Sequence, residues 1–166
     1  MSLLTNKIKY FKPGILSLIA FWVFTLFLVD ISGEFPLIDD WAYAKSVYAF
    51  SELDQVIIYD RIAITFFSNL IWGSVFVKLF GFSFLILRIS SVVAAIILLF
   101  IFYKTLSFFT SNESIKIIST SFLAFNPLFY LLSLTFMTDV FFLMISFTSI
   151  FFFLSFFKKR NLNYLI

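Results

Sequence analysis

Residues 84–103 read FLILRISSVVAAIILLFIFY, and this stretch decides the class of fold. It contains a single charged residue, Arg88, near its start. A helix of about 20 apolar residues is long enough to cross the hydrocarbon core of a bilayer. Residues 140–157, VFFLMISFTSIFFFLSFF, form a second run without any charge, and Lys158-Lys159-Arg160 follow it. Both runs predict membrane-spanning helices.

The composition of the whole chain of 166 residues agrees with a lipid-embedded fold. Apolar residues make up 62% and charged residues 13%, whereas soluble domains average about 45–50% and 25%. This excludes a disordered tail and argues against a soluble enzyme. The chain has no Cys and no His. Disulfides, thiol nucleophiles, His metal ligands and Ser-His-Asp triads are therefore excluded, and catalysis would need carboxylates, Lys or Arg, hydroxyls or the backbone.

Two further apolar stretches predict spans. Residues 15–29 follow a basic N-terminus and lack the cleavage site of a signal peptide, so they predict a retained anchor. Residues 115–134 are interrupted by Asn126-Pro127, which should kink or split the helix because proline removes a backbone donor. Thr110 and Glu113, just before this span, fit a capping box. The predicted fold class is all-α: one polytopic membrane domain, residues 1–166, with about four transmembrane helices.

The segment between the first two predicted spans, residues 32–83, predicts one or two shorter juxtamembrane helices. Apolar side chains recur at helical spacing from Trp41 onward, which indicates an amphipathic helix at the interface. Residues 62–80 are apolar but short for a crossing and contain Asn69 and Gly73. The distribution of basic residues decides whether they cross or lie at the interface.

Basic residues favour an interfacial position for residues 62–80 with a cytoplasmic N-terminus. Eight then lie inside and four outside, whereas a crossing would leave five inside and seven outside, against the positive-inside rule. The eight are Lys7, Lys9, Lys12, Lys104, Lys116, Lys158, Lys159 and Arg160, and the four are Lys45, Arg61, Lys78 and Arg88. The sequence thus predicts an integral membrane protein whose N-terminus is cytoplasmic.

Asp39 and Asp40 are the first candidate catalytic residues. They stand side by side at the predicted start of the interfacial helix, on the outer side of the membrane. In a chain without His, a carboxylate is the most available base, and Asp39 or Asp40 could deprotonate an acceptor hydroxyl while its neighbour binds a cation. The alternative is structural: Asp39 caps the helix and Asp40 is a first-turn acid that the helix dipole favours.

Asp139 lies between two predicted spans and falls on the same outer side as Asp39 and Asp40. An ionisable group at such a position is costly and is a functional candidate. Together, Asp139 and Asp40 could hold Mg²⁺ or Mn²⁺ through oxygen ligands. The alternative is that Asp139 caps the last span.

Arg61 and Arg88 are candidates for binding a lipid-linked phosphate, because guanidinium groups offer two parallel donors to phosphate oxygens. The alternative is that these basic side chains only extend to the headgroup level, as is common at the ends of spans.

The ordered set of these motifs resembles the N-terminal part of the GT-C superfamily of membrane glycosyltransferases. The motifs are the acidic pair 39–40, the segment VKLFGFS at 77–83 before Arg88, NPLF at 126–129 and FMTD at 136–139. The similar members, such as protein O-mannosyltransferases and lipid A aminoarabinose transferases, use polyprenyl-phosphate sugars. The resemblance implies sugar transfer from such a carrier to a lipid, glycan or protein hydroxyl, with Asp39 as the base and Asp139 near the metal or donor phosphate.

Two other functions remain open from the sequence. A transporter or flippase would carry ionisable residues in the middle of its spans, which are nearly free of charge here. A non-catalytic anchor or assembly protein would not need the acidic pair. The expected partners are the lipid-linked donor, the acceptor and membrane lipids, with no nucleic acid. Residues 161–166 resemble the start of another helix, so we expect the chain to be the first part of a longer protein.

Overall fold

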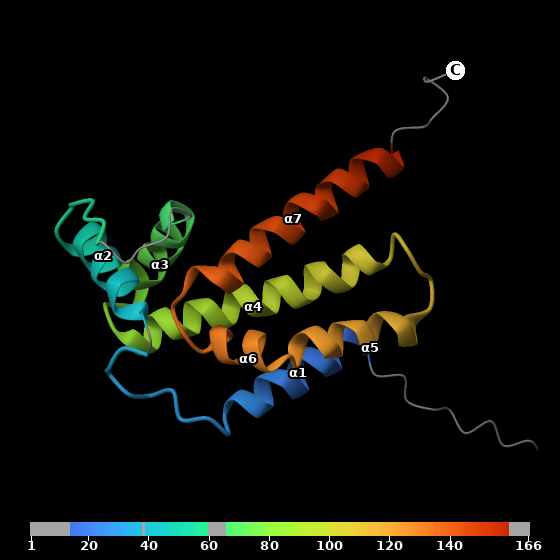
Figure 1. The fold of residues 1–166 in the computed structure, drawn as a ribbon, viewed down its shortest axis with the longest axis horizontal. Coiled ribbons are helices and arrows are strands. Elements are labelled where there is room, and N and C mark those ends of the chain that lie inside the picture. Colours follow the sequence, from blue (N-terminus) through green and yellow to red (C-terminus); the bar gives the residue numbers. More distant parts are fainter. Residues whose placement is uncertain (1–13, 38, 60–65, 160–166) are drawn as a thin grey trace, which may run out of the picture.

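In the computed structural model, which describes residues 14–37, 39–59 and 66–159, the chain is helical and, within these ranges, has no strand (Figure 1). The helices are α1 Ile15–Leu26, α2 Asp40–Glu52, α3 Phe66–Phe80, α4 Phe84–Leu106, α5 Glu113–Ala124, α6 Pro127–Ser133 and α7 Thr138–Lys159. The all-α class is confirmed.

The two apolar runs that decide the fold form the longest helices. In the described part of the chain, only α4 and α7 are individually long and apolar enough to cross a membrane, and the bent pair α5–α6 would make a third span. The four predicted spans are thus not all of crossing length. The predicted span 15–29 is wrong in extent, because α1 stops at Leu26, after 12 residues. It is shorter than the helix of about 20 residues that a bilayer core needs.

The predicted break in the third span is confirmed. Helices α5 and α6 meet at an angle of 64°. The Asn126 side chain caps α6 by accepting hydrogen bonds from the N–H groups of Leu128 (3.0 Å) and Phe129 (3.2 Å), and Pro127 occupies the first turn. A proline is tolerated there because its missing donor would have no helical partner.

The break at Asn126-Pro127 leaves a backbone acceptor that a distant tryptophan satisfies. The N–H of Leu128 would bond the carbonyl of Ala124 in a continuous helix, but it is turned to the Asn126 side chain. The indole N–H of Trp22 donates to that Ala124 carbonyl instead, at 2.8 Å, and Trp22 is fully buried. This hydrogen bond ties α1 to α5, since buried carbonyls need partners.

The capping box predicted at Thr110 is wrong. The cap of α5 is Asn112, whose side chain accepts hydrogen bonds from the N–H groups of Ser114 and Ile115. Thr110 accepts a hydrogen bond from the Asn112 N–H and lies two residues before the cap position. Glu113 is bonded to Tyr103 and Lys116 rather than to the helix start. Asn and Thr both cap helices, so the sequence pattern alone could not choose between them.

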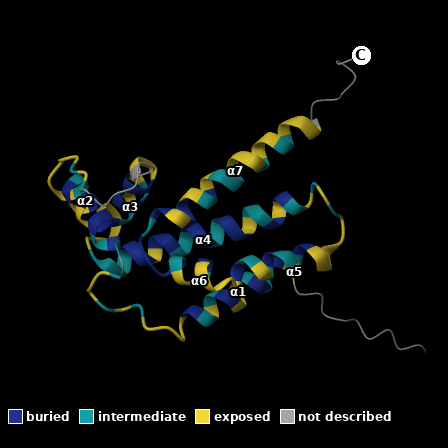
Figure 2. Cartoon of the chain, viewed as in Figure 1, coloured by how far each residue is buried: buried dark blue, intermediate teal, exposed yellow. Residues whose placement is uncertain are grey.

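Helices α1, α4, α5, α6 and α7 share the larger core. Its centre includes Trp22, Ala94, Ala95, Phe129 and Phe141. Figure 2 shows that few residues of α4 are exposed, whereas exposed residues dominate the C-terminal half of α7. Large apolar side chains that are exposed on such a helix suit contact with lipid.

Helices α2 and α3 lie side by side at one end of α4, and the turn between α4 and α5 lies at the other end (Figure 1). A smaller core joins α2, α3 and the start of α4, and Phe136 from the α6–α7 turn enters it. Trp72 fixes α3 to α4 by donating its indole N–H to the Ser90 carbonyl at 3.0 Å. The two helices predicted within residues 32–83 are confirmed, and this α2–α3 end of the bundle holds the acidic motifs.

Gly73 permits the close approach of α3 to its neighbours. A Cβ atom at this position would lie 2.5 Å from the Phe136 ring and 3.1 Å from Val47. Both neighbours are buried, so neither can move away freely. We expect Gly73→Ala to lower the free energy of unfolding by about 1–3 kcal/mol, as overpacking does. Unfolding in detergent, with Val75→Ala on the exposed face of α3 as the control, measures this, and an unchanged Gly73→Ala protein would contradict the packing.

Candidate active site at the α2–α3 end of the bundle

Asp40 is fully buried at the start of α2. Its Oδ1 accepts a hydrogen bond from the Leu37 N–H at 2.7 Å. Its Oδ2 is buried and accepts none within the described part of the chain. Burial raises the pKa of Asp40 above its ordinary value, although hydrogen bonding by Leu37, the charge of Arg88 and the backbone of Phe136 oppose the shift. Asp40 therefore faces the start of α4 and the α6–α7 turn, away from solvent.

Asp39 differs from Asp40 in its exposure. It is the residue immediately before α2 and is half-buried, and its side chain makes no capping hydrogen bond to the helix. The structural alternative of a side-chain cap at Asp39 is therefore wrong, whereas Asp40 does stand in the first turn. Of the two adjacent acids, Asp39 is the one that a substrate could reach.

Arg88 is buried in the first turns of α4, with 1% of its surface exposed. Its Nη1 donates hydrogen bonds to the carbonyl oxygens of Ile31 (2.8 Å) and Gly33 (2.7 Å), and its Nη2 donates to that of Phe35. Its Nε is buried and has no partner among the described residues. The guanidinium group is thus directed at the segment that leads to Asp39, and it is not exposed to a lipid phosphate.

Glu34 was not singled out by the sequence. Its carboxylate accepts hydrogen bonds from the Ser83 hydroxyl (2.6 Å) and the Phe84 N–H (3.1 Å), at the beginning of α4. The Ser83 hydroxyl lowers the pKa of Glu34, so this exposed acid stays ionised. A serine before an apolar run predicts the cap of α4, but no local signal pairs it with an acid 49 residues earlier.

Asp139 lies in a different environment at the same end of the molecule. It is exposed in the first turn of α7, one residue after the helix begins, so the predicted capping role is wrong. It borders a groove of about 360 Å³ whose other lining residues, apart from Asn126, are apolar. Asp40 is not among these lining residues. The structure brings the two acidic motifs to one end of the bundle, but the groove beside Asp139 does not reach Asp40.

These positions do not fit a Mg²⁺ or Mn²⁺ site made by Asp40 and Asp139. Within residues 14–37, 39–59 and 66–159, no three acids gather closely enough to hold a metal ion. Asp40 is enclosed beside the positive charge of Arg88, which would repel a cation. Arg61, the other candidate for binding phosphate, lies outside the described residues.

The comparison with protein families agrees with the helical arrangement. Residues 62–166, well over half of the chain, match the family described as dolichyl-phosphate-mannose-protein mannosyltransferase. The chain belongs to this family. It is therefore a membrane glycosyltransferase of the GT-C type, as the resemblance of its motifs implied. No curated protein and no solved structure matches it.

The match to the mannosyltransferase family has a boundary that matters for the site. It includes α3, Arg88 and Asp139, but it begins after Asp39 and Asp40. Family membership thus supports the glycosyltransferase class and does not by itself assign the acid pair. The role of Asp39 and Asp40 depends on their position in the structure.

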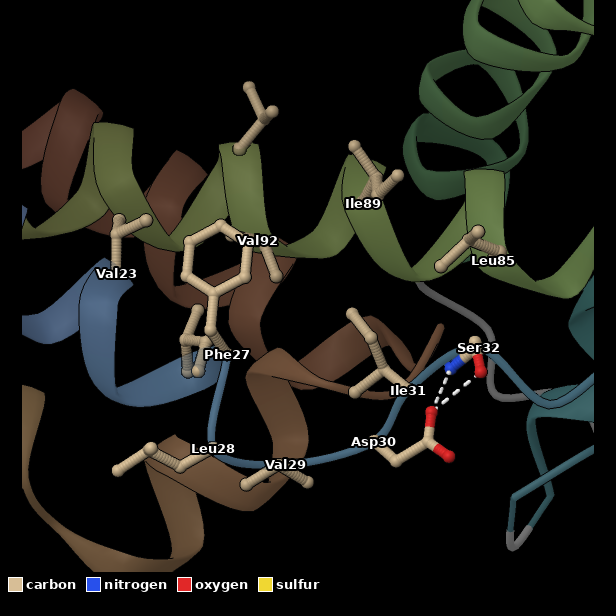
Figure 3. A pocket seen from close by; sticks show the side chains of 12 residues that line it. Val23, Phe27, Leu28, Val29, Asp30, Ile31, Ser32, Leu85, Ile89 and Val92 are labelled. Atoms are coloured by element: carbon tan, nitrogen blue, oxygen red, sulfur yellow. Dashed lines mark hydrogen bonds between the residues drawn. The ribbon is translucent and has the colours of Figure 1, made fainter.

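A groove of this mannosyltransferase-family chain lies between α4 and the end of α1 (Figure 3). It has a volume of about 680 Å³, and its walls are apolar side chains such as Val23, Phe27 and Ile89. Asp30 lies at its edge, where the Ser32 hydroxyl donates a hydrogen bond to the carboxylate (2.6 Å) and lowers the pKa of Asp30. Hydrocarbon fits these walls, but the ionised carboxylate would repel a phosphate.

The opposite pKa shifts of Asp40 and Glu34 predict opposite effects of pH on stability. A raised carboxyl pKa means that the folded state binds the proton of Asp40 more tightly than the unfolded chain does. The stabilisation of the folded state by Asp40 is therefore complete at low pH and is lost as pH rises through its native pKa. The stability advantage of the wild type over Asp40→Asn should therefore fall as pH rises above about 4, the ordinary pKa of the carboxyl group. Thermal unfolding in detergent across this range measures it.

Glu34→Gln is the internal comparison for this pH series. The lowered pKa of Glu34 means that its carboxylate stabilises the folded state above the ordinary pKa, and that this stabilisation is lost as pH falls through the native pKa. The advantage of the wild type over Glu34→Gln should grow with pH, opposite to Asp40→Asn. Two series with the same slope would contradict the environments assigned to these acids.

Proposed function

We propose that the protein transfers a sugar from a polyprenyl-phosphate carrier to a hydroxyl group of a lipid, glycan or protein acceptor. The reaction takes place at the α2–α3 end of the bundle, on the non-cytoplasmic face of the plasma (inner) membrane. The description of the family, which names a dolichyl-phosphate sugar and a protein acceptor, supports the donor and acceptor classes. The distribution of basic residues supports the orientation.

The proposal rests mainly on the difference in burial between two adjacent acids at the start of α2. Asp39 is half-buried, whereas Asp40 is fully buried. The acid that remains accessible can act on a substrate, and the enclosed acid helps to fix the helix start. Because the chain has no His, a carboxylate is the available general base. This base stands at the end of the bundle where a lipid-linked sugar would leave the bilayer.

The proposed reaction is a single displacement. The Asp39 carboxylate accepts the proton of the acceptor hydroxyl while the acceptor oxygen forms a bond to the anomeric carbon. The bond between that carbon and the phosphate oxygen breaks, and polyprenyl phosphate leaves with the electron pair and the negative charge. The configuration at the anomeric carbon is inverted. The phosphate ester is already a good leaving group, so orientation and proton acceptance are the main tasks of the protein.

Arg61 is the residue that we propose for binding the donor phosphate, through paired hydrogen bonds from its guanidinium group. The proposal for Arg88 changes, because its donors are occupied by backbone carbonyls. Arg61 precedes α3 in the sequence and lies in the outer segment with the acid pair. The family match begins one residue after it.

A donor-competition assay tests the function. Proteoliposomes that contain the full-length protein receive either a labelled polyprenyl-phosphate sugar or the same sugar as a nucleotide derivative. A lipid extract, a glycan and a protein are offered in turn as acceptor. We expect label transfer from the polyprenyl-phosphate sugar alone, and none in protein-free liposomes. Transfer from the nucleotide sugar, or from neither donor across lipid, glycan and protein acceptors, would contradict the proposal.

A further inference from the structure

The segment between α1 and α2 is held against the start of α4 at three backbone positions by one side chain. The Arg88 guanidinium group bonds the carbonyl oxygens of Ile31, Gly33 and Phe35. These are alternate residues of a segment more than 50 positions away in the sequence. A planar guanidinium group with several fixed donors suits this task better than a single ammonium group.

A second contact fixes the same segment one helical turn earlier on α4. The Glu34 carboxylate bonds the Ser83 hydroxyl and the Phe84 N–H. Ser83 is itself the cap of α4, since its hydroxyl also accepts from the N–H groups of Leu85 and Ile86. The two contacts cross the same interface in opposite directions. Arg88 extends from α4 to the segment, and Glu34 extends from the segment to the beginning of α4.

The fixed segment leads directly to the acid pair. The Leu37 N–H donates to Asp40 Oδ1 (2.7 Å), and the Asp40 N–H donates to the Leu37 carbonyl (3.2 Å). The positive charge of Arg88 also acts on the enclosed Asp40 carboxylate. The position of Asp39 therefore depends on a chain of contacts that starts at Arg88 and does not involve substrate.

Burial separates this role from phosphate binding. Arg88 is 1% exposed, and three of its N–H groups are bonded to backbone oxygens. A phosphate could reach them only by displacing the segment 31–35. A buried guanidinium group whose donors face carbonyls stabilises a fixed geometry, because losing it would leave those buried carbonyls without a partner.

We propose that Arg88 is a positioning residue for sugar transfer, assisted by Glu34, and that it fixes the segment 31–37 so that Asp39 is held in its reactive place. The inference rests on the function proposed above and assigns Arg88 no contact with donor or acceptor. It predicts that turnover depends on Arg88 while the affinity for donor does not. It also predicts a change in backbone protection that is independent of activity.

Two measurements on the full-length protein in detergent or liposomes test this role. Arg88→Gln should lower kcat about 100-fold, as misplacement by about 1 Å can, while the KM for the polyprenyl-phosphate sugar stays within about twofold. Arg88→Lys keeps the charge but offers its donors from one nitrogen, whereas Arg88 reaches the three carbonyls from two nitrogens in a fixed plane. This variant should therefore remain at least about 10-fold below the wild type. Hydrogen–deuterium exchange of the peptide 30–39 should accelerate in both variants.

Two further variants serve as a control and as an independent test of the fixed segment. Lys104→Gln, at the other end of α4, should change neither turnover nor exchange. Glu34→Ala should accelerate exchange of the peptide 30–39 and lower kcat by several-fold, even if Arg88→Gln does not fold. Full activity in Arg88→Lys, or a raised KM with unchanged exchange in Arg88→Gln, would overturn the inference in favour of phosphate binding.

Asp39→Asn separates a failure of this inference from a failure of the proposed function. This variant should lose transfer while the peptide 30–39 exchanges as in the wild type. If Asp39→Asn stays active, the proposed function fails, and the exchange data on Arg88→Gln and Glu34→Ala still decide whether these residues fix the segment. Unchanged exchange in both of those variants would overturn the positioning role whatever the activity.

Discussion

Replacing Asp39 with Asn is expected to lower the rate of sugar transfer about 10²- to 10⁴-fold, the usual contribution of a general base. The amide is close to the carboxylate in shape but cannot accept the proton of the acceptor hydroxyl. Because Asp39 is half-buried and its side chain does not cap α2, the variant should fold normally. Initial rates in proteoliposomes with matched protein amounts measure the effect.

Asp54→Asn is the control for Asp39→Asn. It makes the same chemical change in the same outer segment, at an exposed residue with a positive φ of 53° that Asn also adopts readily. We expect wild-type transfer in this control. An Asp39→Asn protein that transfers sugar as fast as the Asp54→Asn protein would exclude Asp39 as the base.

The second large effect is expected at Trp22. This side chain is fully buried, donates to the Ala124 carbonyl, and packs against the rings of Phe129 and Tyr130. Trp22→Ala should lower the free energy of unfolding by about 3–5 kcal/mol, as large truncations in cores do. Trp22→Phe retains much of the packing and should cost about 1–3 kcal/mol, because the carbonyl is left without a donor.

Unfolding in mixed detergent measures the effect of Trp22, with Phe24→Ala as the matched control. Phe24 is an aromatic residue of the same helix, but it is 61% exposed, so it should tolerate truncation with little loss. Equal losses in Trp22→Ala and Phe24→Ala would contradict the anchoring of α1 on the break between α5 and α6.

The sequence was most informative where one local property determines structure. Long apolar runs predicted α4 and α7 closely, since hydrophobic length is the main determinant of a span. Pro127 predicted the break, because a missing donor cannot be replaced within a helix. The capping of α5 and the end of α1 were less predictable. Several capping residues compete near Thr110, and apolar residues 27–29 continue the pattern of α1 after its last helical turn.

The sequence predicted which residues belong to the candidate site but not which groups they contact. The adjacent acids were visible because Asp39 and Asp40 stand side by side just before an amphipathic helical pattern. That Asp40 is enclosed and Asp39 accessible follows from packing of α2 against residues that are distant in the sequence. The same holds for Arg88, whose partners lie 53 to 57 positions away. No spacing rule encodes such contacts, because they depend on the tertiary arrangement of helices.

The reaction of Asp39→Cys with a membrane-impermeant maleimide tests whether Asp39 lies in a sugar-transfer site on the non-cytoplasmic face. The chain has no native cysteine, so a single label reports on this position, and Ser111→Cys reports on the opposite end of the bundle. We predict labelling of Asp39→Cys from the non-cytoplasmic side alone and slower labelling when polyprenyl phosphate is present. Labelling from the cytoplasmic side, or a rate that polyprenyl phosphate does not change, would contradict a sugar-transfer site at Asp39.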